Sequence, residues 1–371
     1  MIARPVNRRT FLRAAGGTAA VTGTGRAAPG REVNVGFIGV GSRGSFLLRN
    51  VLQVEGAKVH AVCDISPERQ QGARKLILEA GQGDPQLYED WKKMLDKAPI
   101  EAVISALPCH LHAAAYLDCI AAHKDLYGEK PMCITRTDCD RVVAAAARGD
   151  QVVQIGFQRR ADPRYVETIG QVHNGELGDL IEGRILWSNA WGPLYGWFGH
   201  RKESGDWIVE QAVHAWDVMN WVNQGLPKRA MGMGRSDLFR DMQPDRDVHD
   251  YYAGVVEYEN GVIVNIVHSW VSPGKLNEDY VRLVGTRGGV DFNTGMFSYR
   301  RDLKKPDRPG HTYSGEINNT LLALQAFIDS IRSRKAPIAN AEHGRNAVLA
   351  CLLVREAVYR QTVVSMSEIR A

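Results

Sequence analysis

The feature that most constrains this chain is a short apolar run that ends in three spaced glycines. Residues 33–38 read Val-Asn-Val-Gly-Phe-Ile, and Gly39, Gly41 and Gly44 follow in the pattern G-x-G-x-x-G. Residues 45–52 carry apolar side chains at helical spacing, so the glycines stand between a predicted buried strand and a predicted helix. In that context they permit a tight turn, a close approach of the backbone to a pyrophosphate, and close helix–strand packing.

A carboxylate follows at the distance where a ribose would need one. A second strand is predicted over 57–63, and Asp64 comes directly after it, twenty residues beyond Gly44. An acid at this place accepts hydrogen bonds from the adenosine ribose and repels a 2′-phosphate. The sequence therefore predicts a site for NAD, with NADP less favoured, and Ser42 and Arg43 of the glycine turn are expected to help bind it.

The length and charge of the chain limit its number of domains and its classes of binding partner. The chain has 371 residues, enough for two domains, and its 44% apolar and 24% charged residues are typical of a soluble globular protein. No stretch approaches about 18 uninterrupted apolar residues, so no transmembrane helix is expected. Without the five arginines of residues 1–30, which contain no acid, the formal charge of +4 becomes −1. Nothing in this balance favours nucleic acid or, after removal of the leader, a membrane as partner.

The N-terminus has the order of an export signal. Residues 8–13 read Arg-Arg-Thr-Phe-Leu-Arg, which resembles a twin-arginine motif, and a mildly apolar run follows over 14–25. Small residues at Ala27 and Ala28 offer a cleavage site. We expect residues 1–30 to be a twin-arginine signal peptide and the mature protein to be periplasmic or secreted. The alternative interpretation is a disordered basic tail.

The pattern of elements predicts two domains. In residues 31–157 strands alternate with helices, which indicates an α/β Rossmann domain with a parallel sheet; beyond those above, the predicted strands are 102–107, 125–127 and 151–157, and the helices are 67–80, 89–97, 111–123 and 137–148. Residues 158–371 predict an α+β substrate-binding and oligomerisation domain with a large open, mainly antiparallel sheet; its strands are 180–190, 251–259, 262–271 and 280–284, and its helices are 163–174, 318–333 and 343–361. The last of these helices is expected to pack back on the first domain.

The six cysteines do not form a metal or disulfide pattern. No C-x-x-C occurs, and five of the six lie in the first domain. They are interpreted as buried thiols, and no metal site is predicted.

Two predicted strand ends carry polar groups. Pro108 and His112 follow the strand that ends at 107, and ligands of parallel sheets bind at the carboxyl ends of strands. His112 is therefore a candidate neighbour of the nicotinamide; the alternative is a histidine that caps or solvates a helix start. Glu129 and Lys130 follow the next strand, before Pro131, and Pro108, Glu129 and Lys130 are candidate contacts of the cofactor together with His112. Lys130 is expected to reach a substrate oxygen and the nicotinamide ribose, with a pKa lowered by burial, whereas the alternative is a surface loop.

A third candidate lies on one predicted helix. If residues 210–221 form a continuous helix, Glu210, His214, Asp217 and Trp221 share a face. An imidazole between two carboxylates would be a tuned general base, with Asp217 also able to bind substrate. The alternative is a solvated polar stripe, although the apolar remainder of the helix predicts burial.

Aromatic residues gather beside this helix. Six of the eight tryptophans fall within 187–221. Trp191 and Trp207 are candidate contacts for the C–H faces of a sugar, and the alternative is a tryptophan-rich core or subunit contact. His249, just before the predicted strand 251–259, and His268, within the predicted strand 262–271, are interpreted as structural.

Together these motifs resemble the glucose–fructose oxidoreductase / inositol dehydrogenase / MocA family over nearly the whole mature length. The resemblance rests on residues 36–44, on Glu129-Lys130-Pro131 and on Glu210-x-x-x-His214-x-x-Asp217. It implies a nicotinamide-dependent oxidoreductase acting on sugars, polyols or glycosides, with Lys130 and His214 catalytic, and a homodimer or homotetramer formed through the open sheet. Relatives usually carry Asp four residues before the histidine; here Glu210 is expected either to orient His214 or to bind a hydroxyl.

Export adds one expectation about the reaction. Because free NAD is scarce outside the cytoplasm, the cofactor should leave the cell tightly bound and be recycled in place. The hypothesis is oxidation of a secondary alcohol, with His214 accepting the hydroxyl proton and Lys130 polarising the oxygen. The alternatives are a redox-neutral, NAD-dependent glycosidase on the same scaffold and a non-catalytic sugar sensor.

Overall fold

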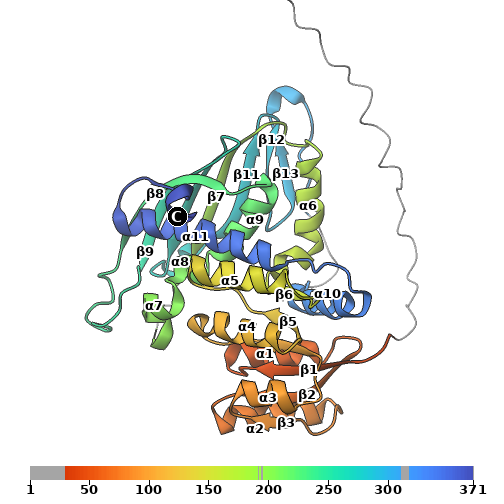
Figure 1. Cartoon of the computed structure of the whole chain (residues 1–371). Helices are drawn as coiled ribbons and strands as arrows, with labels where there is room; N and C mark the ends of the chain where they lie inside the picture. Colours follow the sequence, from red (N-terminus) through yellow and green to blue (C-terminus); the bar gives the residue numbers. More distant parts are fainter. Residues whose placement is uncertain (1–29, 191, 194, 311–316, 371) are drawn as a thin grey trace, which may run out of the picture. The chain divides into compact units, whose positions relative to one another are not determined.

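The computed structural model describes residues 30–190, 192–193, 195–310 and 317–370. From Arg31 onward the chain forms one compact unit built on two sheets (Figure 1). Residues 1–29 of the predicted signal peptide and the candidate sugar contact Trp191 lie outside the described residues. None of the helices in the described ranges is long and apolar enough to cross a membrane.

The first sheet is parallel, with strand order β3-β2-β1-β4-β5-β6, so the predicted Rossmann fold is confirmed. Its strands are β1 (Val33–Ile38), β2 (Ala57–Cys63), β3 (Gln86–Tyr88), β4 (Ala102–Ser105), β5 (Asp125–Gly128) and β6 (Val153–Ile155). The order reverses direction between β1 and β4, and ligands of such sheets bind outside the carboxyl ends of the strands at that point. Only the short strand β3 was not predicted.

Helices cover both faces of this sheet. They are α1 (Ser42–Val51), α2 (Pro67–Glu79), α3 (Trp91–Lys97), α4 (His112–Ala121) and α5 (Arg136–Ala146). Apolar residues of α1 and α2 share one core with α10 (Asn319–Ser333), which contributes Leu324 and Phe327, whereas α3, α4 and α5 cover the other face. The chain therefore returns to the first sheet more than a hundred residues after leaving it.

The second sheet has eight strands in the order β13-β12-β11-β7-β10-β9-β8-β14. They are β7 (Leu180–Ser188), β8 (Pro227–Arg235), β9 (Tyr251–Tyr258), β10 (Ile263–Ser269), β11 (Asp279–Gly285), β12 (Gly288–Asp291), β13 (Met296–Tyr299) and β14 (Val364–Ser365). All its neighbouring strands are antiparallel except β7 and β10, which run parallel, so the prediction of a large, mainly antiparallel sheet is confirmed.

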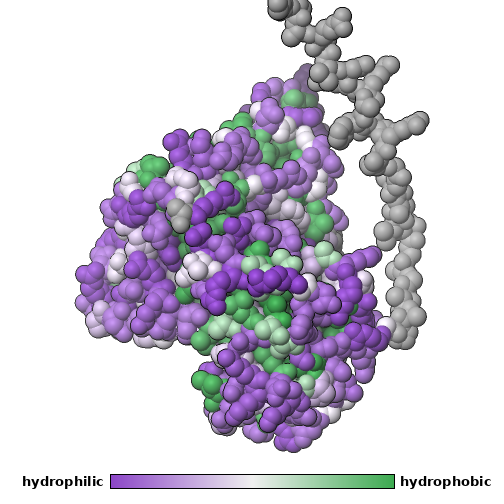
Figure 2. Space-filling model, viewed as in Figure 1, coloured by the Kyte–Doolittle hydropathy of each residue, from purple (hydrophilic) through white to green (hydrophobic). Residues whose placement is uncertain are grey.

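One face of this sheet is covered by helices, the main ones being α6 (Pro163–His173), α9 (Val213–Asn223) and α11 (Ala341–Arg360). The shorter helices of this half are α7 (Arg201–Ser204), α8 (Trp207–Glu210) and α12 (Met366–Arg370). The surface around α11 is largely hydrophilic, with scattered apolar areas (Figure 2).

Helix α11 contacts both halves of the unit. Arg345 pairs with Asp140 of α5 at 2.6 Å, and the Ile155 amide of β6 donates to the Ala339 carbonyl just before α11 at 2.8 Å. The same helix packs on α9 and β8 of the second half. All six cysteines are buried and free, as predicted.

Candidate functional site

The glycine turn has the backbone that a dinucleotide needs. Gly39 has φ +82°, and a Cβ there would stand 2.5 Å from the Ala106 carbonyl oxygen. A Cβ on Gly44 would overlap the carbonyl oxygen of Gly39, so α1 packs against the turn only because this residue lacks a side chain. A Cβ on Gly41 would meet nothing nearer than the end of the Arg69 side chain, at 3.7 Å. The turn is therefore open where a pyrophosphate would approach the start of α1.

Asp64 is fixed at the carboxyl end of β2. One oxygen of its carboxylate accepts the Val40 amide and the other accepts the Ser66 amide, both at 2.9 Å. A carboxylate has lone pairs left after two such bonds, which suits the predicted contact with ribose hydroxyls. A cavity of about 620 Å³ lies next to Asp64 along the chain, with Ile65, Gln70 and Tyr88 among its lining residues.

Lys130 follows β5, and side chains of α4 bind the main-chain carbonyls on either side of it. The Tyr116 hydroxyl donates to the Glu129 carbonyl at 2.6 Å, and Nδ1 of His112 contacts the Pro131 carbonyl at 2.7 Å. The other ring nitrogen of His112 contacts the Leu107 carbonyl at 2.8 Å, and the residue is 1% exposed. The prediction that His112 contacts the nicotinamide is therefore wrong, because both nitrogens are committed to main-chain carbonyls. His112 therefore links the loop after β4, through the Leu107 carbonyl, to the loop after β5, through the Pro131 carbonyl.

The Lys130 ammonium reaches across to the second half of the unit. Its Nζ lies 2.6 Å from Glu210 Oε1 and 2.7 Å from the Glu210 carbonyl oxygen. Burial lowers the pKa of Lys130, but the carboxylates of Glu210 and Glu129 outweigh burial, so the pKa is raised. The predicted lowering of this pKa is therefore wrong: at neutral pH Lys130 is a charged hydrogen-bond donor.

Glu129 connects the lysine to the glycine turn. Its Oε1 accepts from Nε of Arg43 at 2.8 Å, and its side chain is almost fully buried. Arg43 is thus paired within the protein. Its predicted contact with the cofactor stays a prediction, as do those of Ser42, Pro108 and Glu129.

The predicted helix over 210–221 is interrupted. Helix α8 ends at Glu210 and α9 begins at Val213. In the break, Gln211 turns towards β10, where its Oε1 lies 2.8 Å from Nε2 of His268. The prediction of one continuous face is wrong, and the break is what lets Glu210 face Lys130. His268 also contacts the Tyr252 hydroxyl at 3.1 Å, so its interpretation as a structural histidine is confirmed.

His214 lies in the first turn of α9 and is 9% exposed. Its ring is 6.1 Å from that of Phe157 and 6.4 Å from that of Trp187, and its Nδ1 is buried without a hydrogen-bond partner among the described residues. Burial lowers its pKa well below the ordinary value, and the cations Lys130, Arg159 and Arg43 lower it further. The predicted pair of flanking carboxylates is therefore wrong: cations surround a neutral imidazole.

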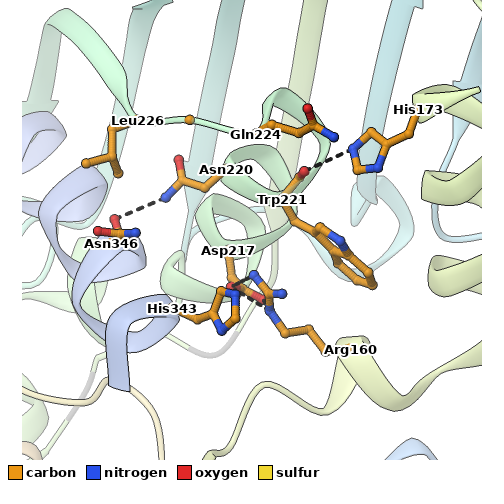
Figure 3. A pocket seen from close by; sticks show the side chains of 10 residues that line it. Arg160, His173, Asp217, Asn220, Trp221, Gln224, Leu226, His343 and Asn346 are labelled. Atoms are coloured by element: carbon orange, nitrogen blue, oxygen red, sulfur yellow. Dashed lines mark hydrogen bonds and ion pairs between the residues drawn. The ribbon is translucent and has the colours of Figure 1, made fainter. Parts of the chain in front are cut away.

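Asp217 is held elsewhere. Arg160 binds its carboxylate at 2.8–3.0 Å, both side chains are buried, and the guanidinium carbon lies 4.8 Å from the centre of the Trp221 ring. The three line a separate cavity of about 390 Å³, together with His343 and other residues (Figure 3), whereas neither Lys130 nor His214 lines it. The carboxylate is engaged by Arg160, and no carboxylate is among the groups that act on His214, so the prediction that Asp217 flanks the imidazole is wrong. Its predicted role in substrate binding stays a prediction.

Trp207 is a core residue. It is 0% exposed, its indole N–H donates to the His249 carbonyl, and its ring centre lies 3.9 Å from that of His268. With no exposed surface, it cannot offer a face to a sugar in this structure. The prediction of a substrate contact is corrected to the alternative of a tryptophan-rich core.

Two residues near His214 were missed. Arg159 comes just after β6, and Trp187 lies near the end of β7. The Arg159 guanidinium carbon is 5.6 Å from the centre of the Trp187 ring and 5.5 Å from that of Tyr165. The rule that ligands bind at the carboxyl ends of parallel strands would have singled out Arg159, since the strand over 151–157 was predicted.

Among the described residues no group of three or more His, Cys, Asp or Glu side chains is placed to hold a metal ion. The fold and the glycine turn together define a two-part protein that binds a nicotinamide dinucleotide on its first sheet. Residues 33–157 match the family model described as "Oxidoreductase family, NAD-binding Rossmann fold", and residues 168–291 match the "GFO/IDH/MocA C-terminal domain".

Comparison with single proteins agrees with these models. Inositol 2-dehydrogenase 2 of Saccharopolyspora erythraea is 31% identical over 265 residues, which is 70% of this chain and 73% of that protein. Inositol 2-dehydrogenase of Salmonella typhimurium is 33% identical over 195 residues, 51% of this chain and 54% of that protein, so the chain spans about half the length of such curated relatives. The chain belongs to the GFO/IDH/MocA family, and its first sheet is an NAD-binding Rossmann domain.

The fold is also shared with a solved structure. Scyllo-inositol dehydrogenase from Lactobacillus casei, with bound NAD(H) and scyllo-inositol, superposes with a TM-score of 0.74 at 20% identity, covering 91% of this chain and 100% of that one. At this identity the likeness concerns the fold alone.

Proposed function

We propose that this chain is an NAD-dependent oxidoreductase that oxidises a secondary alcohol of a sugar, polyol or glycoside. The observation that carries the proposal is that a charged lysine just after β5 acts on a neutral, buried histidine whose ring lies 6.1 Å from that of Phe157, just after β6. Relatives that are inositol dehydrogenases support the class of substrate. NAD, when bound, accepts the hydride.

Lys130 and His214 have different roles in the steps other than hydride transfer. Lys130 donates a hydrogen bond to the substrate oxygen and stabilises negative charge on it, since its own proton is retained by the pairing with Glu210. His214 is neutral, so it can take the hydroxyl proton. The hydroxyl oxygen loses this proton, the carbon that bears the oxygen loses a hydride, and a carbonyl results.

Glu210 acts through Lys130. It accepts from the ammonium with both its carboxylate and its carbonyl oxygen, which fixes the direction in which the remaining N–H bond points. This assigns to Glu210 the positioning of Lys130, whereas the earlier expectation was that it orients His214 or binds a hydroxyl.

The test is reduction of protein-bound NAD, followed at 340 nm, with a panel of inositols, aldoses and glycosides. Wild-type protein should reduce its NAD with at least one of them, and Lys130→Met should still bind NAD but lose turnover by about 10²- to 10⁴-fold. An exposed control, Lys75→Met on α2, should leave both unchanged. Equal rates for Lys130→Met and wild type would contradict the proposal. Release of free sugar without net NADH would favour the glycosidase, and absence of deuterium exchange at any sugar carbon would favour the sensor.

We also propose a homodimer or homotetramer formed through the open face of the second sheet. Exposed apolar side chains of that sheet lie on adjacent strands: Met231 and Met233 on β8, Val255 on β9 and Ile263 on β10. In the sheet register Met231 lies opposite Val255, whereas Ile263 lies opposite Glu257 and Glu182, so charged side chains are interspersed among the apolar ones. Exposed apolar patches of this kind are typical of protein–protein contacts.

For localisation we propose export by the twin-arginine route. Support comes from the residue order Arg8-Arg9-Thr10-Phe11-Leu12 and from the acid-free composition of residues 1–30. Cell fractionation of the full chain and of an Arg8→Lys/Arg9→Lys variant tests it. The full chain should appear outside the cytoplasm and the variant inside, and equal distribution of the two would contradict export by this route.

A further inference from the structure

Arg159 is a cation without a partner at the edge of the candidate site. Among the described residues no hydrogen bond or ion pair engages its guanidinium, and Nη1 is buried with no acceptor. It lies between the rings of Tyr165 and Trp187, at 5.5 and 5.6 Å from their centres. A buried guanidinium nitrogen without an acceptor is costly, which points to an acceptor that a ligand supplies.

The same side chain lies close to the reacting groups. Trp187 is the neighbour of His214, with ring centres 6.4 Å apart, and the charge of Arg159 acts on the His214 imidazole. Since Arg159 follows β6, it also belongs to the edge of the first sheet that carries Lys130. A group bound by Arg159 would therefore be part of the molecule whose hydroxyl lies at His214.

The other cations near this place already have anionic partners. Lys130 is paired with Glu210, Arg43 with Glu129, and Arg160 with Asp217. The charge of Arg159 acts on two carboxylates, Asp217, which is paired with Arg160, and Asp279, which is exposed to solvent; neither forms an ion pair with Arg159 in the described part of the chain. One positive charge thus remains without direct compensation, which matches a carboxylate better than a phosphate dianion.

We propose that the physiological substrate is a sugar or polyol derivative bearing a carboxylate, and that Arg159 binds this carboxylate while the neighbouring hydroxyl is oxidised. The proposal rests on the proposed function and names its substrate class. The guanidinium carbon lies over the rings of Tyr165 and Trp187, and a charged hydrogen bond made beside apolar surface is stronger than one made in water.

Binding of a carboxylate at Arg159 would also affect the protonation of His214. The charged groups that act on it are the cations Lys130, Arg159 and Arg43. A substrate carboxylate on Arg159 would offset one of these charges and make the imidazole a better proton acceptor. Binding of the acidic group and proton removal would then reinforce each other.

The experiment compares matched sugars on NAD-loaded protein: D-glucuronate with D-glucose, D-galacturonate with D-galactose, and D-glucose 6-phosphate as the phosphate case. Binding is measured by thermal shift, and hydride transfer by absorbance at 340 nm. The carboxylates should bind and react about 10- to 100-fold better than the neutral sugars. Arg159→Gln should bring the ratio of acid to neutral sugar near one, whereas Arg184→Gln, an exposed arginine of β7, should leave the ratio unchanged.

Asp279→Asn gives a further check, because removal of a competing carboxylate should increase the preference for acids. A preference for neutral sugars or for the phosphate, or a ratio that survives in Arg159→Gln, would overturn the inference. Failure of the proposed function is a different result: no sugar, acidic or neutral, would reduce the bound NAD, whereas stabilisation by the carboxylates and its loss in Arg159→Gln would still be read from the thermal shift.

Discussion

Lys130 and His214 are set to opposite protonation states by their neighbours. Glu210 and Glu129 keep the lysine charged, and burial with nearby cations keeps the histidine neutral. A donor that does not lose its proton and an acceptor that is free to take one are what oxidation of an alcohol requires. Neither state follows from residue type alone.

The pH dependence of the reaction should reflect His214. Its pKa in the folded protein is lowered, so the imidazole is neutral at pH 7 and stays neutral as the pH falls through the ordinary histidine value of about 6.5. The acid limb of kcat/KM for bound-NAD reduction should therefore lie below about pH 6.5. A rate that already falls between pH 8 and 7 as acid is added would show that the histidine is protonated there and would contradict this assignment.

Among the elements, the break between α8 and α9 has the largest effect on the site. A continuous helix would place Glu210 beside His214, whereas the break turns it to Lys130. At the break Gln211 contacts His268, which is 57 residues away in the sequence. Helical spacing describes only local geometry, so it could not show a contact made by a distant strand.

The other elements also fall into two groups, those that local sequence signals predict and those that depend on contacts with distant residues. The glycine turn, Asp64 and the parallel strands were predictable, because their signals are local and lie in the right order. Strand β8 was missed because Gly232 and Gly234 interrupt its pattern, and they are glycines because α11 packs there: a Cβ on Gly232 would stand 2.7 Å from Val358. Arg160, the partner that removes Asp217 from His214, is likewise 57 residues away in the sequence.

The buried pair of Arg160 and Asp217 should hold α9 in place. Asp217→Ala leaves a buried guanidinium without its carboxylate and should lower the free energy of unfolding by about 3–5 kcal/mol. Urea denaturation measures the loss. Glu182→Ala, which breaks the exposed pair with Arg184, should cost no more than about 1 kcal/mol. Equal small losses for the two variants would mean that the buried pair does not anchor the helix.

For the molecule as a whole, the open sheet face predicts association. Met233→Glu and Val255→Glu should convert the oligomer to smaller species in sedimentation velocity, because charges would be buried at the contact. Leu78→Glu, at an exposed apolar residue on α2, serves as control and should not change the sedimentation coefficient. A wild-type monomer would refute the proposed contact.

The folded protein as a whole should also be sensitive to mild acid. Burial lowers the pKa of His112, His214 and His268, and it lowers that of His343 to about 4. The unfolded chain takes up these protons near pH 6.5 while the folded chain resists them, so stability is full above that pH and is lost as the pH falls below it. The midpoint of thermal unfolding should drop between pH 7 and 5. A constant midpoint would show that these histidines are protonated without cost.

The central claim is that Lys130 and His214 act on one substrate oxygen. A double-mutant cycle on single-turnover reduction of bound NAD, using wild type, Lys130→Met, His214→Asn and the double variant, tests it most directly. Residues that serve one oxygen act as a unit, so the double variant should be scarcely slower than the slower single variant. Effects that multiply would place the two side chains in independent roles and contradict the claim.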